Sequence, residues 1–239
     1  KTHCTNCPYL KYDYWAKDKV IKILNFSLDH SCNLMCDYCY KQQKDYVKPQ
    51  KQIDIVELIK SLKESKYVRI DAPIYYSSGE ICIQKNENDI IELLKPYEVT
   101  FYTNATRYNN NIHEIIKKPQ SCAIISLDSG TPGTYARIKG VDMFGVVCEN
   151  IKKYASDGGH IILKYIIKEE NSNSQDINGF LALCQTLNIK NIRISRDWRM
   201  GEIAETDMAI KSASARMYYK ARKYNINCFM DGITVCDEW

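Results

Sequence analysis

Apolar and polar positions along the chain alternate between two periods. Spacings of three and four residues, typical of amphipathic helices, predict helices near residues 53–65, 90–94, 111–118, 144–157, 177–184 and 205–223. Short apolar runs predict strands near residues 20–28, from 67 towards 77, and near 99–102, 122–127, 160–167 and 192–195. Helices that separate strands in this way are typical of βαβ units with a parallel sheet. We therefore expect an α/β fold, a partial TIM-like (β/α)6 barrel of parallel strands.

The two ends of the chain fall outside this alternation. Residues 1–19 form a short segment with two cysteines, and residues 225–239 carry Asp231-Gly232 between two strand-like runs, which predicts a β-hairpin. We expect three parts: this N-terminal segment, a barrel domain over residues 20–224, and a C-terminal hairpin that packs with the N-terminal segment.

Length, charge and cysteine usage narrow the class of protein. A chain of 239 residues suits one domain with a sizeable core. The net charge is +4, and the cations are spread along the chain, which argues against a specific nucleic-acid partner. No apolar run is long enough to span a bilayer. Eleven cysteines, an odd number without regular spacing, favour a reducing cytoplasm over a secreted disulfide scaffold.

Three cysteines at spacings of four and three, Cys32, Cys36 and Cys39, follow the first predicted strand. Thiolates are soft ligands that suit iron–sulfur clusters, and three of them leave one iron of a cubane open. A disulfide with a spare thiol is an alternative, and so is zinc, although zinc prefers four ligands. The motif resembles that of the radical S-adenosylmethionine (radical SAM) superfamily, with Tyr38 at its aromatic position. The resemblance implies a 4Fe–4S cluster whose open iron binds S-adenosylmethionine, and reductive cleavage to a 5′-deoxyadenosyl radical that abstracts hydrogen.

Two further segments resemble cofactor-binding parts of the same superfamily. Ser77 to Glu80 resembles its Gly-Gly-Glu motif, which implies that Ser78, Gly79 and Glu80 bind the methionine amino group; Ser78 replaces the first glycine. Ser126 and Asp128, at the end of the fourth predicted strand, resemble the segment that binds the ribose hydroxyls.

Other candidate site residues lie near the ends of the predicted strands or soon after them. Arg137, in a segment that resembles an arginine-containing turn of the superfamily, could contact a carboxylate. Lys164 lies inside a buried strand and needs a partner, which we expect to be the cofactor carboxylate or Asp128. Asn104, Ser195 and Asp197 also lie near predicted strand ends and are further candidates. Cys82 follows the Glu80 loop and could donate a hydrogen atom in an epimerase, although a small buried apolar role is the simpler interpretation.

The cysteines at the two ends suggest a second metal site. A three-residue bulged hairpin loop would place Cys228 opposite Cys236 on one face, where they could meet Cys4 and Cys7. Four thiolates suit an auxiliary 4Fe–4S cluster or zinc, and free thiols or a disulfide between the ends are the alternatives.

The resemblance implies a class of reaction more clearly than a substrate. We expect an oxidoreductase or epimerase that acts on a small polar substrate, for which a carbohydrate is suggested by analogy, with a flavodoxin or ferredoxin as the electron donor. The alternatives are a peptide-modifying maturase of the same superfamily and a non-catalytic iron–sulfur module for redox sensing or electron transfer.

Overall fold

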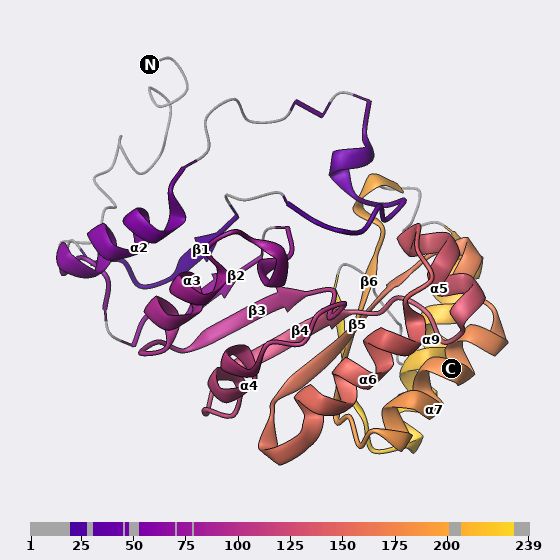
Figure 1. Cartoon of the computed structure of the whole chain (residues 1–239). Helices are drawn as coiled ribbons and strands as arrows, with labels where there is room; N and C mark the ends of the chain where they lie inside the picture. Colours follow the sequence, from indigo (N-terminus) through magenta and orange to yellow (C-terminus); the bar gives the residue numbers. More distant parts are fainter. Residues whose placement is uncertain are drawn as a thin grey trace, which may run out of the picture.

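A single parallel sheet forms the centre of the protein. The computed structural model describes residues 20–27, 31–44, 46–47, 53–69, 71–77, 79–200 and 207–231. Within these residues seven strands lie in chain order, and every neighbouring pair is parallel: β1 Leu24–Phe26, β2 Ile74–Tyr76, β3 Val99–Thr103, β4 Cys122–Ser126, β5 Ile161–Ile167, β6 Asn191–Arg196 and β7 Asn227–Asp231. This sequential order of parallel strands confirms the expected α/β fold (Figure 1).

Helices connect the successive strands, as parallel pairing of neighbours requires a crossover connection. They are α2 Ile55–Glu64, α3 Glu87–Leu94, α4 Asn110–Ile116, α5 Pro132–Lys139, α6 Phe144–Ala155, α7 Ser174–Thr186 and α9 Met208–Lys223. Short 3-10 turns occupy Tyr40–Gln42, Ile81–Ile83, Ser156–Gly158, Glu169–Asn171 and Trp198–Met200. Five helices begin after a residue whose side chain accepts a backbone N–H, the usual device for satisfying the first turn: Asp54, Asn109, Thr131, Asn173 and Asp207.

The two faces of the sheet differ in chemistry. Burial alternates along β3, where Phe101 is fully buried and Tyr102 is half-buried, and along the first residues of β5, where Leu163 is fully buried and Lys164 is half-buried. The buried set packs with the helices in one continuous apolar core. Because side chains alternate across a strand, the second set faces the opposite side, so polar groups are presented there.

Two local expectations are refined by the structure. The second strand is Ile74–Tyr76, because Val68 makes only an isolated bridge with Ile21. The segment expected as a turn around Arg137 is the helix α5, which has Pro132 in its first turn and ends at Gly140 in the left-handed conformation.

The chain end also differs from a free-standing hairpin. β7 pairs in parallel with β6, with Cys228 opposite Ile192, so the sheet continues beyond residue 224. Residues 1–19 and 232–239 lie outside the described part of the chain, so the hairpin's second arm and its packing stay predictions. Among the described residues, no helix is both long and apolar enough to cross a membrane.

Candidate active site

A cavity of about 510 Å³ lies where the carboxyl ends of the strands meet the cysteine segment. Ligands bind at this edge in parallel α/β sheets. Its lining combines the cysteine segment with strand-end residues, among them Cys32, Leu34, Cys36, Tyr38, Cys39, Ser77, Gly79, Asn104, Ser126, Lys164, Arg196 and Trp198. The sequence motifs at residues 32–39, 77–80 and 126 therefore converge on one hollow.

All three motif cysteines line this cavity as free thiols. Cys32 is exposed, whereas Cys36 and Cys39 are half-buried. Burial raises the pKa of the Cys36 thiol, and the nearby Lys139 ammonium opposes that shift. No three His, Cys, Asp or Glu side chains of the described residues converge on a single metal ion. A cubane distributes its thiolates over separate irons, so three soft donors around a cavity suit a 4Fe–4S cluster.

The cysteine segment is attached first to the end of β3. The Glu80 N–H donates to the Ser31 carbonyl at 2.7 Å. The side chains of Asn33, Asn104 and Thr106 form hydrogen bonds with one another, and Asn104 Nδ2 lies 3.7 Å from Cys32 Sγ. The start of the cysteine segment is thus held by groups that belong to two strand ends.

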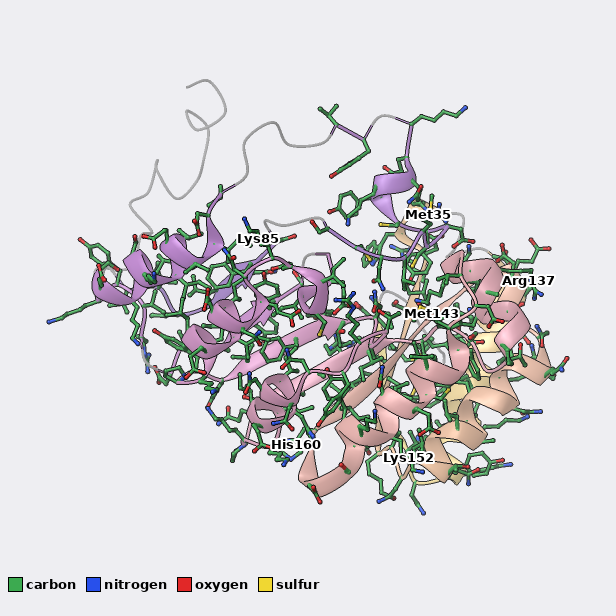
Figure 2. The ribbon with its side chains drawn as sticks, viewed as in Figure 1. Met35, Lys85, Arg137, Met143, Lys152 and His160 are labelled. Atoms are coloured by element: carbon green, nitrogen blue, oxygen red, sulfur yellow. The ribbon has the colours of Figure 1, made fainter. Side chains whose placement is uncertain are left out.

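A second attachment joins the segment to α5 through a buried charged cluster. The Lys139 ammonium forms an ion pair with the Asp128 carboxylate and donates to the Tyr38 hydroxyl at 2.7 Å. The Tyr38 hydroxyl donates in turn to Asp128 Oδ2 at 2.6 Å. Backbone hydrogen bonds from Met35 and Asp37 to the end of α5 run alongside this cluster. Figure 2 shows Met35 above that end of the helix.

A third attachment joins the segment to the loops after β5 and β6. Lys168 forms an ion pair with Asp37, and Arg199 donates to the Asp37 carbonyl. Arg199 also binds Asp197 through both carboxylate oxygens, and these bonds lower the pKa of Asp197 against the raising effect of its burial. Asp197 therefore orients Arg199 towards the cysteine segment.

The Glu80 carboxylate accepts three hydrogen bonds from other groups of the protein. The donors are the Asn104 N–H at 2.6 Å, the Thr103 hydroxyl at 2.8 Å and the Cys82 N–H at 3.2 Å. Burial raises the pKa of Glu80, and these hydrogen bonds oppose the shift. The side chain is fully buried and lies behind the cavity lining, to which Gly79 contributes. Its contact with a methionine amino group stays a prediction, as does that of Ser78, which lies outside the described residues.

Asp128 is likewise used inside the protein. Besides Tyr38 and Lys139, its carboxylate accepts the Ile166 N–H at 2.6 Å. Its backbone is in the left-handed region at φ +57°, which Asp tolerates better than most residues. Ser126 lines the cavity, so of the predicted ribose-binding pair only Ser126 lies where a ligand could reach it.

Lys164 lines the cavity and is half-buried. Burial lowers the pKa of its ammonium, while the Asp128 and Asp231 carboxylates oppose the shift from a distance. Within the described residues, no carboxylate lies at ion-pair distance from it, so the expected direct pair with Asp128 does not form. Lys139 is the actual partner of Asp128. The fully buried Ser195 hydroxyl has no hydrogen-bond partner in the described chain.

Two candidates lie away from the cavity. Arg137 is on the exposed face of α5, where it donates to the Thr134 hydroxyl at 2.8 Å, and Figure 2 shows it at the outer edge of the molecule. Cys82 is buried in the apolar core, and burial raises its thiol pKa. Its position gives no support to the predicted role as hydrogen donor.

Sequence reasoning missed the residues that hold the cysteine segment, chiefly Lys139, Thr106 and Lys168. A signal for Lys139 was present, since it follows Tyr135 and Ile138 on the apolar face of α5. A cation on such a face needs a buried anion, and Asp128, at the end of the fourth predicted strand, is a candidate.

The family model for the radical SAM superfamily matches residues 27–178. The chain therefore belongs to the radical SAM superfamily, as its cysteine motif predicts. Membership supports a 4Fe–4S cluster and S-adenosylmethionine as cofactors.

Curated relatives share about a quarter of the aligned residues with this chain. The probable GTP 3′,8-cyclase of Saccharolobus solfataricus is 26% identical over 177 residues, covering 72% of this chain and 55% of that protein. That of Methanocaldococcus jannaschii is 26% identical over 182 residues, covering 72% and 58%. The chain thus spans little more than half the length of these curated relatives.

Solved structures share the fold at low identity. Streptococcus suis SuiB bound to its precursor peptide SuiA superposes with a TM-score of 0.68 at 14% identity, over 94% of this chain and 51% of SuiB. anSMEcpe with bound AdoMet superposes with a TM-score of 0.60 at 13% identity, over 87% of this chain and 63% of that one.

Proposed function

We propose that this chain forms the catalytic core of an enzyme that cleaves S-adenosylmethionine reductively and abstracts hydrogen from a small anionic substrate. The observation that carries the proposal is the convergence of three free thiols and the strand-end polar groups on one cavity. When bound, the cluster and its cofactor would supply the electron and the radical.

The chain's own residues have three tasks in this proposal. Cys32, Cys36 and Cys39 would hold the cluster. Gly79 and Ser126 line the cavity where polar groups of the cofactor could be oriented. The three attachments of the cysteine segment fix its geometry over the strand ends, and a fixed geometry favours reaction by placing the groups before the chemical step.

The anionic character of the substrate is inferred from two cations on the face of the sheet opposite the apolar core. Lys164 and Arg193 are register partners on β5 and β6, so their side chains leave the sheet on the same face. Neither pairs with a carboxylate among the described residues, and Arg193 has only a 3.4 Å contact from Nη1 to the Tyr102 hydroxyl. Two neighbouring cations with no carboxylate of the described residues at ion-pair distance favour a phosphate or carboxylate ligand. The similarity to probable GTP 3′,8-cyclases gives a nucleotide the same support.

A peptide substrate is the second candidate. The likeness to SuiB, which was solved with a precursor peptide, favours it through the fold alone. Nothing in these comparisons favours the carbohydrate that the sequence suggested, and we do not retain it. A flavodoxin or ferredoxin as electron donor, in a reducing cytoplasm, completes the proposal.

A second metal site stays part of the proposal. Cys228 is half-buried on β7, with its thiol 3.9 Å from the Met230 sulfur, and burial raises its pKa to about 12. Cys4, Cys7 and Cys236 lie outside the described residues. Metal analysis of a variant in which Cys32, Cys36 and Cys39 are all alanine tests this site. About four residual irons would support an auxiliary cluster, and one zinc would support a structural site. A folded variant that holds neither iron nor zinc would contradict the second metal site.

Anaerobic reconstitution tests the main proposal. The chain is incubated with iron and sulfide, reduced with dithionite, and given S-adenosylmethionine, and 5′-deoxyadenosine is measured by mass spectrometry. We expect product from the unaltered chain and from Cys122→Ala, whose thiol lies outside the motif, and none from Cys36→Ala. A reducible cluster without 5′-deoxyadenosine would instead support the redox-sensing or electron-transfer alternative.

A further inference from the structure

Three side chains close a ring of hydrogen bonds between the cysteine segment and the turn after β3. Asn33 Nδ2 donates to Thr106 Oγ1 at 2.8 Å, and Thr106 Oγ1 donates to Asn104 Oδ1 at 2.7 Å. Asn104 Nδ2 then donates to Asn33 Oδ1 at 3.0 Å. Every donor in this ring has an acceptor.

The ring determines which way the Asn104 amide faces. Asn104 Oδ1 accepts two donors, the Thr106 hydroxyl and the Thr106 N–H, the latter at 2.9 Å. Exchanging the amide oxygen and nitrogen would place an N–H group against the Thr106 N–H and leave that backbone donor without an acceptor, which is costly in a residue that is only 8% exposed. The amide nitrogen must therefore face the cysteine segment.

One N–H of that nitrogen is left for sulfur. The first binds Asn33, and the nitrogen lies 3.7 Å from Cys32 Sγ, within the longer hydrogen-bond range of sulfur. The backbone is held as well, because the Asn104 N–H donates to Glu80 and the Glu80 N–H donates to Ser31, next to Cys32. The donor is thus fixed relative to the thiol before any ligand binds.

We propose that Asn104 is a positioning residue that donates a hydrogen bond to the Cys32 thiolate and raises the reduction potential of the cluster this thiolate holds. The inference rests on the proposed function, because it requires a cluster at Cys32. A dipole whose positive end faces sulfur stabilises the additional electron of the reduced cluster. The proposed effect on the reduction potential does not depend on bound S-adenosylmethionine, so it can be measured in the absence of that cofactor.

A redox titration of the reconstituted chain, followed by electron paramagnetic resonance, tests the proposal. Asn104→Leu keeps the branched shape and removes the donor. We expect the ratio of reduced to oxidised cluster at a fixed potential to fall about tenfold, which equals a shift of ~59 mV to more negative potential for one electron. An exchangeable proton coupled to the reduced cluster, detected by electron–nuclear double resonance in H₂O against D₂O, should disappear.

Thr106→Val is the matched control. It opens the ring but keeps the N–H at residue 106 that orients the Asn104 amide, so less than half of the shift is expected. Equal shifts in both variants, or no shift in Asn104→Leu, would overturn the inference. If Asn104→Leu does not fold, Asn104→Asp replaces the N–H by a carboxylate oxygen and should shift the potential further in the same direction; an unchanged potential there would equally overturn it. An unaltered chain that takes up no cluster would contradict the proposed function instead.

Discussion

The Lys139 ammonium forms an ion pair with the Asp128 carboxylate at the junction of α5 and β4, and both side chains are almost completely buried, at 1% and 0% exposure. The Tyr38 hydroxyl bonds to both charged groups, so the pair also fixes the cysteine segment. The rigidity of the candidate cluster site therefore depends on a charge pair that contributes little to the cavity surface.

Lys139→Met should destabilise the protein by about 3–5 kcal/mol, because it leaves the Asp128 carboxylate buried without its counter-charge. Urea unfolding followed by circular dichroism measures the change. Lys60→Met is the control, since Lys60 pairs with Glu57 on the surface of α2, and it should leave the midpoint almost unchanged. Adding Asp128→Asn to Lys139→Met should restore part of the loss. Equal midpoints for the two lysine variants would show that the buried pair is not important for stability.

Tyr38→Phe should cost about 1.5–3 kcal/mol, because it removes a hydrogen bond between the hydroxyl and a charged carboxylate. The Lys139–Asp128 pair remains, so the loss should be smaller than for Lys139→Met. Tyr67→Phe, at an exposed position, is the matched control. The same urea titration applies, and a Tyr38→Phe midpoint equal to that of Tyr67→Phe would contradict the role of the hydroxyl.

The fold was predictable because periodicity is a local property of the sequence. The runs at residues 99–102, 122–127 and 160–167 correspond to β3, β4 and β5 within one or two residues. The sequence predicted the seventh strand only as one arm of a terminal hairpin, and its parallel pairing with β6 was not anticipated. Residues 227–231 pair with a distant neighbour, and the turn signal at Asp231-Gly232 competed with that assignment.

The candidate site was predictable only where one motif carries its own chemistry. The spacing of the three cysteines predicts a cluster, and the three side chains line the cavity together. The sequence does not show which side chains pair with one another across the fold. Lys164 and Lys139 are both cations within apolar stretches, and only tertiary structure shows that Asp128 pairs with Lys139.

Cys82→Ala should leave product formation unchanged in a reaction that the reconstituted chain catalyses. The thiol is 2% exposed and lies in the apolar core, so it cannot reach a substrate in the cavity. Removal of the small side chain should cost about 1–2 kcal/mol through the space left behind. Cys184→Ala, buried on α7, serves as the control for a core cysteine. Loss of one stereochemical product in Cys82→Ala alone, measured by chiral chromatography, would restore the hydrogen-donor hypothesis.

The affinity for an anionic substrate should fall with rising pH because of Lys164. Burial lowers the pKa of this ammonium below the ordinary lysine value of 10.5. Since only the protonated form attracts an anion, the affinity is highest below the lowered pKa and falls as the pH rises through it. A bound anion favours the charged form and moves this loss to higher pH than in the free protein.

Isothermal titration of GTP into the reconstituted chain between pH 7 and pH 10 measures this dependence. We expect Lys164→Met to weaken binding roughly 10- to 100-fold at pH 7, as loss of a charge-assisted hydrogen bond of ~1.5–3 kcal/mol requires. It should also flatten the pH curve. Lys152→Met is the control, because Lys152 is exposed on α6, on the lower side of Figure 2 and away from Met35. If Lys164→Met and Lys152→Met bind GTP with the same affinity and pH dependence, Lys164 does not contact the anion, and the case for an anionic substrate loses its structural basis.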